Sequence, residues 1–252
     1  MIRSIAKIYL TVLIIICLIV NIFSWDATLM NFDKILSAPD SSAIFGYDDY
    51  GRNIANRIFV GFFASLKVVL ISVFFSFLFG VFFGLISGYF GNWLDKFFLF
   101  VCTIFQAFPN MLLIIAVAAF MGPGLYNLIF ALTITSWVGL AKIARAEALK
   151  LKNLDFIYAA KIMGANELFI LKKHFFKNTF TPLRVELNYL FANLIIAEAG
   201  LSFLGIGQTG EQPSWGNMLR DSIDYLIVGP HYTLSVSFFM TFLILSINSL
   251  SE

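Results

Sequence analysis

Few residues of this chain combine a reactive side chain with a setting that suggests chemistry. Glu198 lies within an apolar run, residues 181–204. A carboxylate inside a membrane span is costly, so a functional or water-lined position is one hypothesis. A position near the outer interface, where the side chain reaches water, is the equal alternative. His174 and His231 fall in segments expected on opposite sides of a membrane, so we expect no histidine metal site.

The motifs of common catalytic classes are missing from the sequence. No Gly-x-x-x-x-Gly-Lys-Ser/Thr phosphate loop occurs, so the chain cannot hydrolyse ATP by that mechanism. No Ser/His/Asp set and no pair of carboxylates points to catalysis. Cys17 and Cys102 both fall in apolar runs, which favours a packing role over a disulfide or a metal site. We therefore expect no enzyme activity, no metal and no cofactor on this chain.

The composition favours an all-α, polytopic membrane protein. Hydrophobic residues make up 60% of the chain and charged residues only 13%, which is far from the composition of a soluble domain. A bilayer core needs roughly twenty apolar residues per helix, and about six runs satisfy this. They cover residues 8–23, 64–89, 97–121, 125–144, 181–204 and 233–250.

Residues within and beside these runs predict finer features. Pro109 should kink or break the third span, because it removes a backbone hydrogen bond. Before the second span, Asp48 and Asp49 could cap an interfacial helix over residues 50–63. Trp215, in a glycine-rich loop, can anchor that loop at the membrane interface.

Small residues recur on one face of the second span. They are four residues apart, and this spacing places them on the same side of a helix. In lipid, small residues let a second helix backbone come close, whereas apolarity alone gives little drive for pairing. We therefore expect a helix-packing role for Ser72, Ser76, Gly80, Gly84 and Gly88.

Charges along the chain indicate its orientation. The interval 26–57 is mainly acidic, whereas the interval 142–184 is strongly basic. The basic residues are Lys142, Arg145, Lys150, Lys152, Lys161, Lys172, Lys173, Lys177 and Arg184. Positively charged loops stay in the cytoplasm, so we place this interval and both termini there.

The longest polar interval, which begins at Asp155, is expected to fold as two short helices with a corner between them. Asp155 can cap the first helix, and Asn166 can cap the second. Gly164 can end the first helix, because glycine adopts a left-handed backbone without steric cost. Ala159 and Ala160 would give the first helix a small surface that another protein could approach closely.

This interval resembles the cytoplasmic EAA loop of ATP-binding-cassette (ABC) importer permeases. The family pattern reads Glu-Ala-Ala, three residues, Gly, nine residues and Ile-x-Leu-Pro. This chain has Tyr158 in place of the acid, His174 at the Ile position, and Phe176 and Lys177 in place of Leu-Pro. The resemblance implies a loop that couples to ATPases, within about residues 147–181, and its expected contact residues are Tyr158, Ala159, Ala160, Gly164, Ala165 and His174.

Three further stretches, residues 45–54, 197–207 and 213–219, resemble the C-type permeases of dipeptide, oligopeptide and nickel importers. With the EAA-type loop, the resemblance covers about residues 45–250. We assign to the translocation path or the extracytoplasmic loop Glu198, Trp215, Asp48, Asp49 and Arg52.

The resemblance implies the setting in which the chain works. It implies a heterodimer with a homologous B-type permease, two cytoplasmic ATPases that hold ATP-Mg, and an extracytoplasmic substrate-binding protein. The location would be a bacterial inner membrane, the cargo a peptide or nickel, and no nucleic acid would bind. Residues 1–44 would form the first span and the start of the extracytoplasmic loop, and residues 45–252 the permease domain.

A secondary transporter or channel that works without ATPases is the alternative function. It would require charged relays in several spans or inverted repeats. The sequence shows only Glu198 as a candidate relay residue, so the importer permease is favoured.

Overall fold

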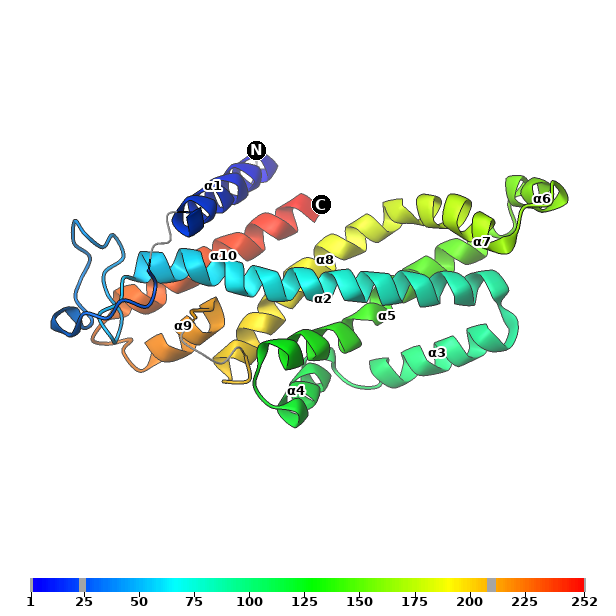
Figure 1. Ribbon diagram of the computed structural model, residues 1–252. Coiled ribbons are helices and arrows are strands. Elements are labelled where there is room, and N and C mark those ends of the chain that lie inside the picture. The colour runs from blue at the N-terminus through cyan, green and yellow to red at the C-terminus, as the bar shows by residue number, and fades with distance from the viewer. Residues whose placement is uncertain (1, 23–25, 208–211, 252) are drawn as a thin grey trace.

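The computed structural model describes residues 2–22, 26–207 and 212–251, and these form helices joined by short loops, without a β-strand among them. Figure 1 shows an elongated bundle with α6 at one end, and with the loop 26–53 and α9 near the other. The helices are α1 (Ile2–Ile22), α2 (Ile54–Phe90), α3 (Asn92–Gln106), α4 (Asn110–Met121), α5 (Leu125–Leu151), α6 (Asp155–Ile162), α7 (Glu167–Ile170), α8 (Phe176–Phe203), α9 (Trp215–Ile223) and α10 (Pro230–Ser251), with a 3-10 helix at Phe32–Lys34 and a π-helix at Leu171–Phe175.

Several of these helices have the length and apolarity of membrane spans. Within the described residues, α2, α5 and α10 qualify alone, and α3 with α4 qualifies as one broken span. The apolar part of α1, Ala6–Val20, is shorter, and residue 23, where the first span was expected to end, lies outside the described residues. The count of about six spans and the cytoplasmic position of both termini stay predictions.

The break in the third span occurs where the sequence predicts it. The axes of α3 and α4 differ by 85°, and Pro109 stands at the N-cap of α4 with φ of −56°. Pro109 has no N–H to continue the α3 ladder, so the chain turns there and starts a new helix. The bend holds α4 at a steep angle to the rest of the bundle (Figure 1).

The start of α2 differs from the sequence-based expectation. Residues 50–63 do not form a separate interfacial helix, because α2 runs unbroken from Ile54 to Phe90. Asp48 and Asp49 do not cap it; the Asn53 side chain does, by accepting hydrogen bonds from the backbone N–H of Ala55 and Asn56. Asp48 is engaged elsewhere, with two arginines.

The stripe of small residues on α2 lies against α5. The Ser72 and Ser76 hydroxyls donate to the carbonyls of Ile129 and Thr133, each 57 residues further along the chain. A Cβ atom added at the next stripe position, Gly80, would stand 2.7 Å from the Trp137 carbonyl. A Cβ atom added at Gly84 would stand 2.2 Å from the Ala141 carbonyl oxygen, and one added at Gly88 would stand 2.6 Å from that of Arg145. Because the contacting residues are always 57 positions apart in the sequence, the two helices run parallel. Only small residues fit between them.

An ion pair between side chains connects α3 to α5 near the C-terminal ends of α2 and α5. Arg145 of α5 forms two hydrogen bonds with Asp95 of α3, and the Ser87 hydroxyl of α2 donates to the same carboxylate at 2.6 Å. At the opposite side of the bundle, α1 packs along α10, and the Tyr9 hydroxyl donates to the Phe239 carbonyl at 3.0 Å. The bundle therefore has a rigid parallel pair, α2 and α5, around which α3, α4, α8 and α10 are arranged.

Candidate functional site

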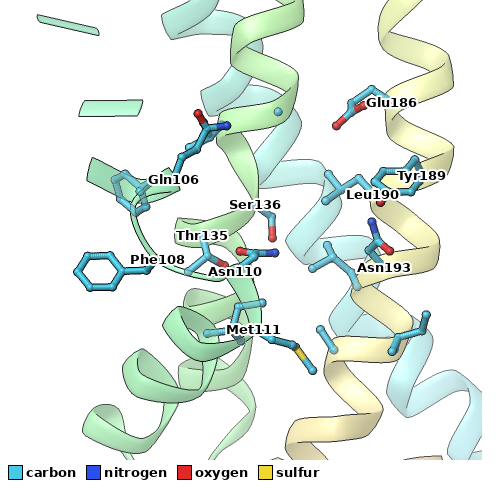
Figure 2. A pocket seen from close by; sticks show the side chains of 17 residues that line it. Gln106, Phe108, Asn110, Met111, Thr135, Ser136, Glu186, Tyr189, Leu190 and Asn193 are labelled. Carbon is cyan, nitrogen blue, oxygen red and sulfur yellow. The ribbon is translucent and has the colours of Figure 1, made fainter. Parts of the chain in front are cut away.

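A cavity of about 600 Å³ opens between the α3–α4 break, α5 and α8 (Figure 2). Apolar side chains form much of its wall, and a smaller set of polar groups faces into it. A largely apolar cleft with a few convergent polar groups is the usual form of a small-molecule site. The polar residues are Gln106, Asn110, Thr135, Ser136, Glu186, Tyr189 and Asn193.

Local features of three elements place these groups. The break at Pro109 brings Gln106, at the end of α3, and Asn110, at the start of α4, to the same opening. On α5, Thr135 donates to the carbonyl of Ala131 one turn earlier, at 3.0 Å. The hydroxyl of Ser136 is buried and has no hydrogen-bond partner among the described residues.

The α8 wall of the cavity was missed by the sequence reasoning. The polar residues on this wall are Glu186, Tyr189, three residues later, and Asn193, seven residues later. This spacing places them on one face of α8. This spacing of polar residues in an apolar helix was the available signal. The charge of Glu198, which stands out in the sequence, drew attention to a different part of the same helix.

Glu198 does not line the cavity. Its side chain is 1% exposed and accepts a hydrogen bond from the Ser202 hydroxyl at 2.9 Å. It lies with Ser65 and Trp215 around a small internal space between α2, α8 and α9. Trp215 is also buried, and its Nε1 donates to the Ile58 carbonyl at 2.8 Å. Within this chain, Glu198 therefore lies neither in a water-lined path nor at an interface where it reaches water. Trp215 connects α9 to α2 inside the protein.

A second region, which we call the corner, comprises α6, α7 and the turn between them. Gly164 has φ of +82°, and the backbone there turns as the sequence predicts. Asn166 caps α7 by accepting a hydrogen bond from the Phe169 N–H at 2.7 Å. The predicted cap at Asp155 is wrong, because Leu154 occupies the N-cap and Asp155 is already the first helical residue. There the Asp155 carboxylate stands in the first turn, where a negative charge suits the helix dipole.

The corner presents apolar side chains that no other described part of the chain covers. Ile162, Met163 and Leu168 are 87%, 81% and 76% exposed. Of the two predicted contact alanines, Ala159 is exposed and Ala160 is buried. The corner also contains a hollow of about 650 Å³, and its lining includes Ala159, Ala160, Gly164, Ala165 and His174. Tyr158 is exposed on the outside of α6. Exposed apolar clusters of this kind are typical of surfaces that contact another protein or a membrane.

An aromatic contact is among those that connect the corner to the long helices of the bundle. The π-helix Leu171–Phe175 joins α7 to α8 and buries Phe175. The Phe175 ring packs edge-on against Tyr89 at the end of α2, with ring centroids 5.1 Å apart. Lys161 of α6 also lies against Tyr89, with its Nζ 5.1 Å from the centroid of the ring. Tyr89 of α2 is thus in contact with both α6 and the segment that leads into α8.

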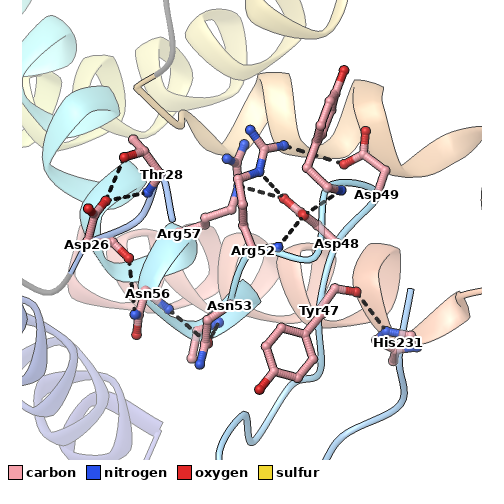
Figure 3. A network of polar contacts seen from close by, with 12 residues as sticks. Asp26, Thr28, Tyr47, Asp48, Asp49, Arg52, Asn53, Asn56, Arg57 and His231 are labelled. Atoms are coloured by element: carbon pink, nitrogen blue, oxygen red, sulfur yellow. Dashed lines mark hydrogen bonds and ion pairs between the residues drawn. The ribbon is translucent and has the colours of Figure 1, made fainter. Parts of the chain in front are cut away.

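A third region, which we call the Asp48 network and which comprises Asp48, Asp49, Arg52 and Arg57, holds the loop 26–53 against α2 (Figure 3). The buried Asp48 carboxylate accepts from Arg52 Nε at 2.7 Å and lies 3.2 Å from Arg57 Nε. Asp49 stands 3.5 Å from the Arg52 guanidinium. Burial, and next the charge of Asp48, raise the pKa of the Asp49 carboxyl. Asp48, Asp49 and Arg52 are thus brought together, but they do not contact the cavity.

Comparison with known proteins identifies the chain. The family described as binding-protein-dependent transport system inner membrane component matches residues 80–252. This chain belongs to that family. It is therefore a permease subunit of an ABC importer, a multi-pass protein of the bacterial inner membrane that works with ATPases and a substrate-binding protein.

Named relatives of the permease cover most of its length. The glutathione transport system permease protein GsiD of Pectobacterium atrosepticum is 32% identical over 245 residues, which are 94% of this chain and 81% of that protein. The dipeptide transport system permease protein DppC of Alkalihalophilus pseudofirmus is 33% identical over 217 residues, or 86% of this chain and 71% of that protein. DppC of Bacillus subtilis is also 33% identical, over 215 residues, 85% of this chain and 67% of that protein.

The fold of the permease has a counterpart among solved structures. A chain of the MetNI methionine ABC transporter, solved in inward-facing conformations, superposes with a TM-score of 0.59. The two chains are 19% identical, and the match covers 76% of this permease and 91% of that chain. The likeness supports the all-α transporter fold. These permeases are not enzymes, which agrees with the lack of a catalytic set in the sequence.

Proposed function

We propose that this permease carries short peptides across the inner membrane through the cavity between α3–α4, α5 and α8. The supporting observation is the cavity itself, because its amide and hydroxyl groups suit the hydrogen-bonding groups of a peptide backbone. The named relatives, which are glutathione and dipeptide permeases, point to the same class of cargo.

Nickel is the competing cargo, and the lining of the cavity argues against it. Imidazole and thiolate groups are the ligands that favour nickel in proteins. The described lining residues include no histidine and no cysteine, and they offer a single carboxylate, Glu186. A free nickel ion would find few ligands there, whereas a peptide would find several hydrogen-bond partners.

The partners follow from two surfaces of the permease. A homologous B-type permease would close the open side of the cavity, so that a heterodimer encloses the path. The corner would dock in a cleft of a cytoplasmic ATPase, where ATP-Mg is bound and hydrolysed by the partner. The contact of Tyr89 with Phe175 and Lys161 would carry ATPase movement to α2 and α8.

A transport assay tests the cargo directly. In a strain deleted for this gene, uptake of a radiolabelled dipeptide and of nickel is measured with and without the restored wild-type gene. We expect the wild-type gene to restore dipeptide uptake, and Asn193→Leu, which keeps the shape of the side chain but removes its hydrogen-bonding groups, to restore much less at equal protein level. Restored nickel uptake without dipeptide uptake would contradict the proposal.

A further inference from the structure

Glu186 differs from the other residues of the cavity in carrying a charge. Of the described residues that line it, only Glu186 is formally charged. Its side chain is partly buried, and it forms no ion pair or hydrogen bond within the described part of the chain. A partly buried carboxylate loses some of its hydration, so a cation placed beside it would be favourable.

The wall opposite Glu186 comes close to its carboxylate at a glycine. Gly139 of α5 faces it, and a Cβ atom added at Gly139 would stand 2.5 Å from Glu186 Oε1. Any larger residue at position 139 would therefore displace the carboxylate. Figure 2 shows the Glu186 side chain extending from α8 toward α5, at the edge of the cavity. The glycine leaves room for a charged group at this position.

Nearby cations within the chain do not neutralise the carboxylate. Lys142 lies one turn beyond Gly139 on α5, but its ammonium donates to the Gln106 side-chain oxygen. Arg184, two residues before Glu186 on α8, is exposed. Neither forms an ion pair with Glu186 among the described residues. The described part of the chain therefore leaves Glu186 free to pair with a cation that enters the cavity.

From these observations we infer that Glu186 binds the positively charged amino end of the cargo as it passes through the cavity. The N-terminal amine of a peptide has a pKa of about 8, so most of it is an ammonium at neutral pH. Asn193 and Tyr189, on the same face of α8, lie where they can hydrogen-bond the amide groups that follow the ammonium. The inference rests on the proposed peptide path. It adds an orientation for the peptide, with its amino end bound by Glu186.

A charge-selective labelling experiment tests this without depending on transport. The assembled transporter, with Cys17 and Cys102 replaced by alanine, carries Asn193→Cys as a reporter in the cavity. Its rates of reaction with a cationic and an anionic methanethiosulfonate reagent are compared before and after adding Glu186→Gln. We expect the cation-to-anion rate ratio to fall about fivefold with Glu186→Gln, because each reagent loses one charge interaction of opposite sign.

A matched control and a second readout separate the possible outcomes. Glu147→Gln removes an exposed pair with Lys150 on α5, outside the cavity, and should leave the ratio unchanged. Dipeptide uptake should fall about tenfold with Glu186→Gln at equal protein level. An unchanged ratio or undiminished uptake would overturn the role of Glu186. Failure of the wild-type permease to import dipeptides, with the ratio still dependent on Glu186, would instead overturn the proposed cargo.

Discussion

The two ends of the permease are held together in opposite ways. At the end that holds the Asp48 network, Asp48 is 0% exposed and binds two buried arginines, so its interactions are completed within the chain. At the corner, short helices leave apolar side chains such as Ile162 in solvent. Both ends expose some apolar side chains, but a buried ion network is present at the first end, whereas the corner consists of short helices around a hollow. This difference is what a permease needs if force from an ATPase enters at one end only.

The comparison first requires that the two ends face opposite sides of the membrane. Ile44, which is 74% exposed, and Lys172, which is also exposed, are single-cysteine sites in a variant without Cys17 and Cys102. A membrane-impermeant maleimide added to intact cells should label Ile44→Cys fully and Lys172→Cys only after the cells are opened. The reverse pattern would invert the topology and exchange the roles of the two ends.

The largest effect on stability is expected at Asp48. Asp48→Ala leaves Arg52 and Arg57 buried without their carboxylate, which should destabilise the permease by about 3–5 kcal/mol. Asp33→Ala, in the same loop but exposed, is the control and should have little effect. Thermal unfolding of the purified permease in detergent measures both. Equal unfolding temperatures for the two variants would show that the network does not hold this end.

A smaller effect is expected in the seam that connects the ends. A Cβ atom at Gly84 would lie 2.2 Å from the Ala141 carbonyl, so Gly84→Ala should separate α2 from α5 and cost about 1–3 kcal/mol. Gly200→Ala is matched, because its Cβ would meet only the flexible end of Met111. The same unfolding assay should show a lower midpoint for Gly84→Ala alone. A similar midpoint for both variants would contradict the close packing.

The smallest effect is expected at the corner, where the backbone rather than packing sets the shape. A Cβ at Gly164 would meet nothing within 4 Å, so Gly164→Ala acts only through its positive φ. The strain of about 1 kcal/mol should weaken ATPase binding roughly fivefold. Gly164→Asn should be milder, since asparagine accepts this conformation. Titration of the ATPase onto each variant measures the effect, and tighter binding by Gly164→Ala would favour a continuous helix through the corner.

Features set by neighbouring residues could be predicted from the sequence. The break at Pro109, the left-handed turn at Gly164 and the cap at Asn166 each depend on the local backbone, and the structure shows all three. The small residues at Gly80 and Gly84 could be placed on one face by spacing alone, although their partner helix could not be named. The family could be predicted as well, because its motifs are contiguous in the chain.

Features set by distant segments could not be predicted in this way. Asp48 could have capped a helix by its position, but Arg57 competes for its carboxylate, and Asn53 is left to cap α2. Glu198 is conspicuous in an apolar run, yet α2 and α9 cover it completely. The importance of Glu186 depends on Gly139, 47 residues earlier in the chain, which becomes its neighbour only after α5 and α8 pack.

The central claim is that the corner docks on the ATPase. Two exposed isoleucines at opposite ends of the permease test it most directly. Ile162→Asp places a charge on the corner, whereas Ile227→Asp places one at a 95% exposed position at the opposite end. Neither should destabilise the isolated permease, because both side chains are exposed. The ATPase subunits that co-purify with each variant from membranes are quantified. We predict that Ile162→Asp loses most of the ATPase while Ile227→Asp retains it, and full recovery with Ile162→Asp would contradict the claim.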